Sequence, residues 1–154
     1  MKGLWKLLSF VAKHPLNRGG RASAIARVLR WQLGSRLLPV GSALPFVADT
    51  RLFVTRGMTG ATGNWYCGLH EVDEMGFVLH ALRPGDLFVD VGANIGSYTV
   101  LAAGAVGADA IAVEPVPTTF TAFLEVEPRP RVFPNGLPNA EALVASQQWR
   151  CAVD

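Results

Sequence analysis

Residues 86–115 read DLFVDVGANIGSYTVLAAGAVGADAIAVEP, and this stretch decides the fold. The short apolar run Leu87–Val91 predicts a strand that is buried on both faces of a parallel sheet. Residues 92–96 form a glycine-rich turn, and a helix of small and apolar residues follows it. A second apolar run, Asp109–Val113, ends at the acid Glu114. A strand, a helix and a strand of this size make a right-handed parallel crossover, so the stretch predicts an α/β fold.

The turn carries the chemistry of this unit. Gly92 and Gly96 allow the backbone to come close to a ligand that a Cβ atom would exclude. The start of the following helix offers free N–H groups and a partial positive charge to an anionic group. Glu114 lies 24 positions beyond Asp90, near the spacing at which an acid binds the ribose of a nucleotide. The stretch therefore predicts a site for a cofactor that contains adenosine.

The spacing of the turn residues favours one cofactor over another. A dinucleotide site has the pattern G-x-G-x-x-G, whose second glycine lets the pyrophosphate touch the backbone. Here the pattern is Asp90-x-Gly92-x-Asn94-x-Gly96, and Asn94 occupies the middle position. This disfavours NAD and favours S-adenosylmethionine, which has no pyrophosphate and whose amino group can bind to Asp90. The alternative is that Asp90 caps the helix and that the glycines only shape a tight turn.

A longer pattern surrounds the turn. Its segments are MTGATGNWYCGLHE (58–71), LRPGD (82–86), VDVGANIGSYT (89–99) and AVEP (112–115). Together, over residues 4–124, they resemble the N-terminal portion of the FkbM family of S-adenosylmethionine-dependent methyltransferases. The resemblance implies a Rossmann-like class I methyltransferase fold, S-adenosyl-L-methionine as cofactor, and methylation of a hydroxyl on a small molecule or sugar. It also implies cofactor contacts by Asp90, Gly92, Asn94, Gly96 and Glu114, whereas it assigns no catalytic residue and no metal ligand.

The length of the chain bears on its domains. The 154 residues are one domain's worth, and half of them are hydrophobic, which is enough for a core. We expect a helical and hairpin extension with a lid at residues 1–83, and an incomplete cofactor-binding domain at residues 84–154. The sheet is then truncated after its first two or three strands. Two other readings stay open: a truncated, non-catalytic fragment, and an NAD-binding oxidoreductase half-domain.

Charge is distributed unevenly along the chain. Eight of the 14 basic residues precede Asp49, the first of the 12 acids. Residues 1–13 interleave leucine and tryptophan with lysine, which predicts an amphipathic helix. We expect it to pack on the domain, and a weak peripheral contact with a membrane is the alternative. We expect no nucleic acid partner, and the sequence leaves the oligomeric state open.

No apolar run reaches the ~20 residues that span a bilayer. Lys6 also interrupts the stretch where a signal peptide would need apolar residues. We therefore expect a cytoplasmic location, for which two free thiols, Cys67 and Cys151, are also suited.

The remaining elements are predicted from periodicity and turn residues. The predictions are a helix at 21–38, a hairpin with strands at 46–48 and 52–55, a helix at 71–82, helices at 117–124 and 139–146, and a third sheet strand at 148–153. The prolines between residues 128 and 138 exclude a helix there. Glycines predict a loop at 57–68. In one reading its Asn64, Trp65 and Tyr66 fold over the cofactor or acceptor, and in the alternative Trp65 and Tyr66 pack in the core or in a lid. His70 beside Glu71 is either an acid–base pair or a polar helix start.

Overall fold

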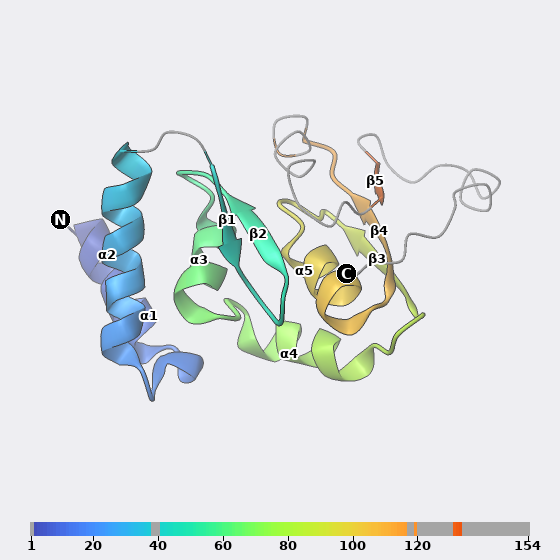
Figure 1. Cartoon of the computed structure of the whole chain (residues 1–154), viewed down its shortest axis with the longest axis horizontal. Coiled ribbons are helices and arrows are strands. Elements are labelled where there is room, and N and C mark those ends of the chain that lie inside the picture. The colour runs from blue at the N-terminus through green and yellow to red at the C-terminus, as the bar shows by residue number, and fades with distance from the viewer. Residues whose placement is uncertain (1, 38–40, 117–118, 120–130, 134–154) are drawn as a thin grey trace.

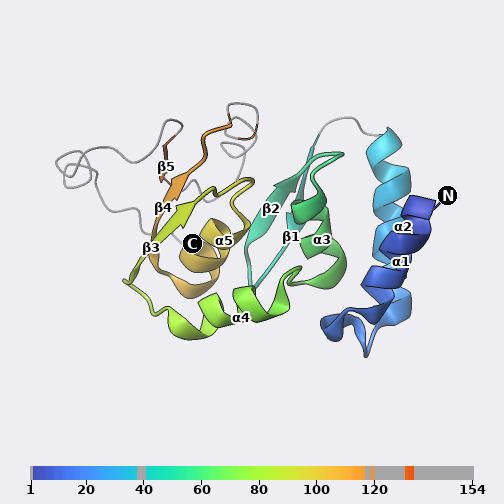
Figure 2. The ribbon, with the colours of Figure 1, turned by 180° about the vertical axis from the view of Figure 1, so that it is seen from behind.

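The computed structural model describes residues 2–37, 41–116, 119 and 131–133. Its elements form three groups side by side (Figure 1), and Figure 2 shows the same arrangement from behind. Two helices lie at one end, a hairpin and a helix lie in the middle, and a parallel sheet lies at the other end. The bounds before the sheet are α1 (Lys2–Lys13), η1 (Pro15–Asn17), α2 (Arg21–Leu37), β1 (Ser42–Pro45), β2 (Arg51–Val54), α3 (Thr59–Cys67) and α4 (Val72–Ala81).

The sheet at the far end confirms the predicted α/β, Rossmann-like arrangement. Its strands are β3 (Leu87–Val91), β4 (Asp109–Val113) and β5 (Arg131–Phe133), which lie parallel in the order β3-β4-β5. The crossover from β3 to β4 is α5 (Ser97–Val100), which continues as the π-helical segment η2 (Leu101–Val106). Gly107 ends this segment in the left-handed conformation, with φ of 83°, as expected of a glycine that follows a helix.

One face of β3 is exposed, so the prediction that this strand is buried on both faces is wrong. Leu87, Val89 and Val91 are exposed, whereas Phe88 and Asp90, which alternate with them, are partly buried. The physical reason is that α5 packs on one face of the strand, where Thr99 contacts Asp90. Among the described residues, no element covers the opposite face to the same degree.

The two N-terminal helices pack on each other and on α3. Val11, Ala24 and Val28 are fully buried in one cluster with Tyr66 and Cys67 of α3. The apolar side of α1 therefore packs on the domain, as we expected of this amphipathic helix. Asn17 and Arg27 tie the three helices together, since both donate hydrogen bonds to the carbonyl of Tyr66, at 3.2 and 2.7 Å.

The hairpin is present, but its first strand begins earlier than the predicted 46–48. The N–H of Phe46 donates to the carbonyl of Thr50, and the Thr50 hydroxyl donates to Val47. Ala48 has a positive φ of 52°. Residues 46–50 are thus the turn itself, and β1 precedes them.

Residues 59–67 form a helix, so the predicted loop at 57–68 is wrong over most of its length. Gly63 lies in this helix at a point where the ring of His70 packs against it. A Cβ atom on Gly63 would lie 2.4 Å from Nδ1 of His70, so only glycine fits there. Tyr66 is buried and Trp65 is partly buried, which agrees with the alternative that these two side chains pack in the core. Asn64 is also buried.

The predicted helix at 71–82 is confirmed as α4, and the helix at 21–38 as α2 over the described residues. The third sheet strand lies at Arg131–Phe133 rather than at 148–153. The predicted elements at 139–146 and 148–153, and 117–124 apart from Thr119, lie outside the described residues.

A second buried cluster joins the middle group to the sheet. Leu52 and Val54 of β2 and Ala61 of α3 pack with Ile95 and Val100, which flank the start of α5. This cluster draws on residues from both sides of position 84, where we placed the domain boundary. In the part of the chain that the structure describes, no helix combines the length and the apolar character needed to cross a membrane.

Candidate functional site

The turn between β3 and α5 has the backbone shape that its glycines allow. Gly92 and Gly96 have φ of 81° and 76°, and Asn94 between them has φ of 52°. Asparagine tolerates this left-handed region better than most residues. The amides of Gly92 and Ala93 donate to the carbonyl of Val113, at 2.8 and 3.0 Å. The turn is thus held against the end of β4 by its own backbone.

The side chain of Glu114 also binds the backbone of this turn. Its carboxylate accepts the amide of Asn94 at 2.7 Å and the amide of Val116 at 2.8 Å, one on each oxygen. The side chain is 4% exposed. A carboxylate has about four acceptor positions, so two remain beside those that these amides take. Glu114 therefore fixes the shape of the turn and keeps acceptor capacity next to it.

Asp90 contacts the first turn of the following helix. Thr99, which is fully buried, donates its hydroxyl to Oδ2 of Asp90 at 2.6 Å. Burial raises the pKa of the Asp90 carboxyl, the hydrogen bonds from the hydroxyl and backbone of Thr99 oppose this rise, and the charge of Glu114 adds to it. Asp90 is thus joined to the start of α5 by the hydroxyl of Thr99.

A cavity of about 350 Å³ opens beside the turn, and we call it the turn cavity. Asn94 and Ile95 line it from the turn, Thr119 lines it from beyond β4, and residues 57–61 line it from the start of α3. Ligand pockets have volumes of about 300–1,000 Å³, and this one is near the lower bound. Residues at and just before the start of α3 therefore lie next to the glycine turn.

The structure brings the five predicted cofactor contacts to one place. Asp90, Gly92, Asn94 and Gly96 follow one another along the chain, and Glu114 is joined to Asn94 by a hydrogen bond. Of the five, Asn94 lines the turn cavity. Gly92 faces open space, because no heavy atom lies within 4 Å of the position that its Cβ would take.

Asn64 positions the start of α5, which sequence reasoning missed. Its Nδ2 donates to the Ser97 hydroxyl at 3.0 Å, and its Oδ1 accepts the amide of His70 at 2.8 Å. Asn64 is 2% exposed. In the sequence Asn64 is a single polar residue among small and aromatic neighbours. This pattern does not predict a hydrogen bond to Ser97, which lies 33 positions further along the chain.

His70 and Glu71 do not form the acid–base pair that the sequence left open. Glu71 accepts a hydrogen bond from the Tyr98 hydroxyl at 2.6 Å. The pKa of Tyr98 is raised. Burial is the largest cause, and the hydrogen bond to Glu71 and the charge of Glu71 are smaller ones. The ring of His70 packs edge-on against Phe10 and lies against Gly63. Both residues thus serve to join elements.

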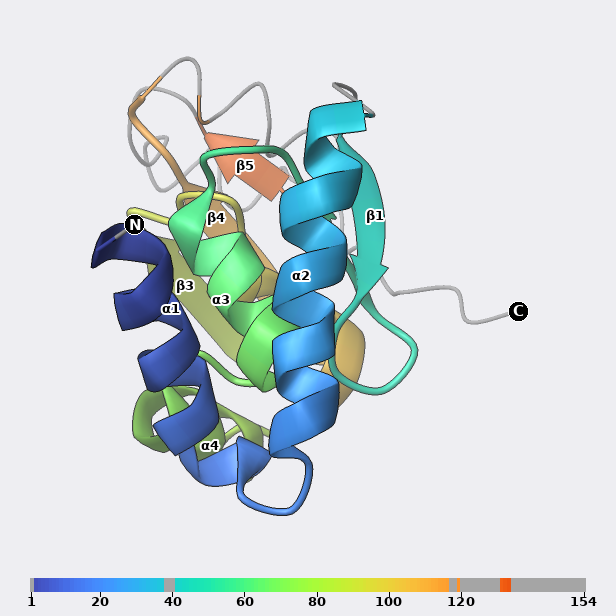
Figure 3. The ribbon, with the colours of Figure 1, turned by 90° about the vertical axis from the view of Figure 1, so that its left-hand side faces the viewer.

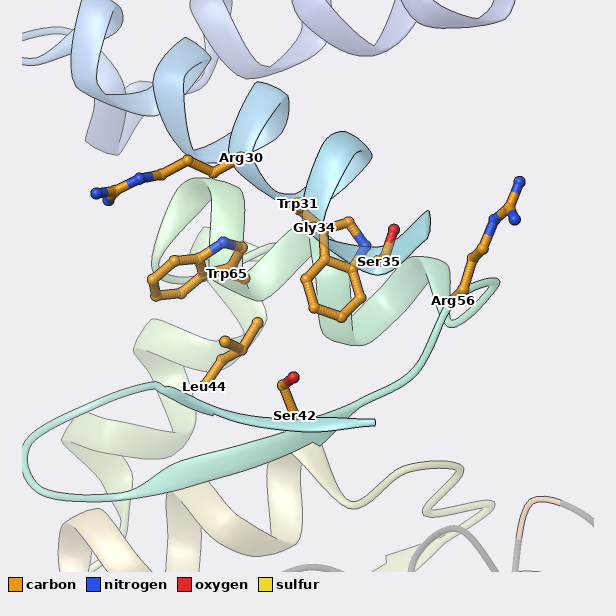
Figure 4. Close-up of a pocket in the computed structure, with 8 residues that line it drawn as sticks. All are labelled: Arg30, Trp31, Gly34, Ser35, Ser42, Leu44, Arg56 and Trp65. Carbon is orange, nitrogen blue, oxygen red and sulfur yellow. The ribbon is translucent and has the colours of Figure 1, made fainter. Parts of the chain in front are cut away.

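A second cavity of about 180 Å³ lies between α2, β1 and α3. The rings of Trp31 and Trp65 line it, and Leu44 points up toward them from the hairpin (Figure 4). Arg30 and Arg56 extend away from the rings at its two ends. None of the predicted cofactor contacts lines this cavity, so the turn cavity is the candidate functional site.

Comparisons with known proteins give similarities to solved structures. A Pyrococcus horikoshii protein named as a transferase is 21% identical, with a TM-score of 0.48 over 64% of this chain and 37% of that one. The P. horikoshii protein TYW2, in complex with MeSAdo, is 19% identical, with a TM-score of 0.48 over 66% and 39%. An Anabaena variabilis protein, named as a methyltransferase from an antibiotic biosynthesis pathway, is 28% identical, with a TM-score of 0.35 over 42% and 26%. The chain thus spans less than half the length of these proteins. No protein-family model and no curated protein matches the sequence.

Proposed function

We propose that the turn at residues 92–96 binds S-adenosyl-L-methionine, and that the chain is the cofactor-binding part of an FkbM-type methyltransferase. One observation carries the proposal: a glycine turn, backed by a buried acid at the end of the next strand, opens onto a cavity of about 350 Å³. In an open parallel sheet, ligands bind at this carboxyl edge of the strands.

The residues present fit the cofactor. Open space in front of Gly92 lets the backbone come close to the amino-acid end of the ligand. Asp90 is the acceptor for its amino group. Glu114 is the acceptor for the ribose hydroxyls, through the positions that its two amide donors leave.

The chemistry follows from these assignments. When bound, S-adenosylmethionine supplies a methyl group on a positively charged sulfur, so the cofactor itself is activated. The chain then has to orient the acceptor and exclude water. We propose a hydroxyl of a small molecule or sugar as the acceptor, on the strength of the FkbM resemblance. A hydroxyl acceptor also needs a base, and we assign this role to no residue.

Calorimetric titration tests the proposal. The chain should bind S-adenosylhomocysteine and not NAD. Gly92→Val should abolish binding, because it places a branched side chain where the ligand lies. Glu114→Ala should weaken binding by about 1–3 kcal/mol, the scale of a lost hydrogen-bonded charged partner.

Matched controls separate loss of the site from loss of the fold. Gly85 also has a positive φ, of 86°, and open space around its Cβ position, so Gly85→Val imposes similar backbone strain away from the turn. Glu74→Ala removes an exposed carboxylate from α4. Both controls should bind like the parent chain. Binding of NAD alone would favour the oxidoreductase reading, and no heat with either ligand would favour the non-catalytic fragment.

A further inference from the structure

The outer side of α2 carries an apolar stripe that no function described so far uses. Leu29, Leu33 and Leu37 are spaced by four residues, so they lie along one side of the helix. Their exposed fractions are 47%, 65% and 80%. The opposite side of α2 is buried through Ala24 and Val28. Single exposed leucines are ordinary, whereas a continuous stripe marks an interaction surface.

Exposed basic residues are frequent in the same N-terminal part of the chain. Six of them lie on α1, on α2 and between the two helices: Lys6, Lys13, Arg18, Arg21, Arg30 and Arg36. The first acid of the chain is Asp49, so no carboxylate side chain from residues 1–48 offsets their charge. A partner for this surface therefore has to be anionic.

A large aromatic side chain adds to the same end of the molecule. Trp5 on α1 is 75% exposed. Figure 3 shows α1 and α2 side by side, running antiparallel, so the start of α1 lies toward the end of α2. In Figure 1 both helices lie at the end of the molecule away from β3, β4 and β5. Tryptophan is favoured where one side of a surface is apolar and the other is wet.

We propose that the outer face of α1 and α2, defined by Trp5, Leu29, Leu33 and Leu37 with the six exposed basic residues, docks on a bilayer surface that contains anionic phospholipid. Leucines enter the boundary between headgroups and acyl chains, while lysines and arginines contact the headgroups. In this arrangement α2 lies in the plane of the interface and does not cross the bilayer. The proposal does not depend on the proposed cofactor site.

Two other partners fit the surface less well. Nucleic acid would contact the basic side chains through its phosphates but would leave the leucine stripe in water. A second copy of the chain would bring the same uncompensated positive charge against itself. Of these three partners, the anionic bilayer is the one that matches both the apolar stripe and the basic residues.

Co-sedimentation of the whole chain with lipid vesicles tests the proposal. Vesicles of phosphatidylcholine with about 30% phosphatidylglycerol should bind the chain at low salt, and pure phosphatidylcholine vesicles should bind it much more weakly. Salt near 0.5 M should weaken binding, because it screens exposed charges. The double variant Leu33→Gln/Leu37→Gln should lower the partition coefficient about tenfold or more.

Control variants remove similar groups elsewhere. Phe77, on α4, is 72% exposed, so Phe77→Gln removes an exposed apolar side chain away from the surface and should leave binding unchanged. The pair Lys6→Gln/Lys13→Gln should weaken binding, whereas Arg51→Gln/Arg83→Gln removes the same number of exposed charges outside α1 and α2 and should not. Circular dichroism checks that each variant is folded.

Several results would overturn the proposal. One is no binding to anionic vesicles, and another is equal loss of binding in the control variants. Binding to RNA that depends on Lys6 and Lys13 but not on the leucines, with no vesicle binding, would identify a nucleic-acid surface instead. A dimer in analytical ultracentrifugation that Leu33→Gln/Leu37→Gln dissociates would assign the stripe to a second copy.

Discussion

Two carboxylates beside the glycine turn have different environments. Glu114 accepts two backbone amides, whereas Asp90 is bonded to Thr99 and faces the charge of Glu114. A buried carboxylate that is incompletely compensated costs stability, and such sites are often retained for function. At position 90 we therefore expect aspartate to favour ligand binding and an uncharged side chain to favour stability.

Asp90→Asn should therefore stabilise the folded chain at neutral pH. Burial raises the pKa of Asp90 above its ordinary value of 3.8. The folded state then binds the proton more tightly than the unfolded state, so the ionisation of Asp90 lowers stability as the pH rises above about 3.8. Asparagine cannot ionise and keeps an oxygen that accepts a bond from Thr99.

Urea denaturation of both chains at pH 4 and pH 7 measures this effect. The free energy of unfolding of Asp90→Asn should exceed that of the parent at pH 7, and the difference should shrink toward pH 4. The same variant should bind S-adenosylhomocysteine more weakly. A variant that is less stable than the parent at pH 7 would mean that the Thr99 bond outweighs the cost of burial.

At the scale of elements, α3 is the helix on which the arrangement depends. Its start lines the turn cavity, Ala61 packs in the cluster that includes Ile95, and Tyr66 and Cys67 pack against the N-terminal helices. Asn64, in the middle of α3, connects it to Ser97 at the start of α5. The position of the turn relative to residues 57–61 therefore depends on this buried side chain.

Asn64→Ala should destabilise the chain by about 1–3 kcal/mol, because it leaves the partly buried amide of His70 without its acceptor and removes the bond to Ser97. Thr62→Ala is the control on the same helix. Its hydroxyl bonds only within α3, to two carbonyls of its own helical turn and to the side chain of Tyr66, so its loss should change stability less than the loss of Asn64, by about 0.5 kcal/mol. Thermal unfolding followed by circular dichroism compares the two. Equal, small effects would show that Asn64 does not hold the two helices together.

At the scale of the whole molecule, the three groups of elements share packing. Trp31 of α2 packs on both buried clusters, and η2 approaches the hairpin so closely that a Cβ on Gly104 would lie 2.5 Å from Thr50. The described groups are thus expected to unfold together.

Cys67 reports on this cooperative unfolding. It is buried, and burial raises the pKa of its thiol to about 11. Because the thiolate is the reactive form, the folded chain should react with iodoacetamide at pH 8 at least about a hundredfold more slowly than an exposed cysteine. In a Cys151→Ser background, mass spectrometry should find modification of Cys67 only in urea concentrations that unfold the chain. Rapid modification without urea would show that α3 opens on its own.

The sequence alone determined the α/β crossover and the placing of the predicted cofactor contacts. The reason is local: glycine is needed where φ is positive at Gly92 and Gly96, and an apolar run that ends at Glu114 brings this acid to the carboxyl edge of the sheet. Helices α2 and α4 followed from periodicity in the same way. Helix α2 begins at the predicted residue, and α4 begins and ends one residue inside its predicted bounds.

Only the tertiary structure decided how the remaining glycines and apolar residues are used. Gly63 looks like a helix breaker in sequence, but it lies in a helix because His70 packs against it. Val89 and Val91 look like buried residues, but only the face of β3 that bears Asp90 meets α5. Burial depends on which elements meet, and these contacts join residues that are far apart in the chain. For the same reason, the leucine stripe on α2 became visible as an exposed surface only once the packed side of that helix was known.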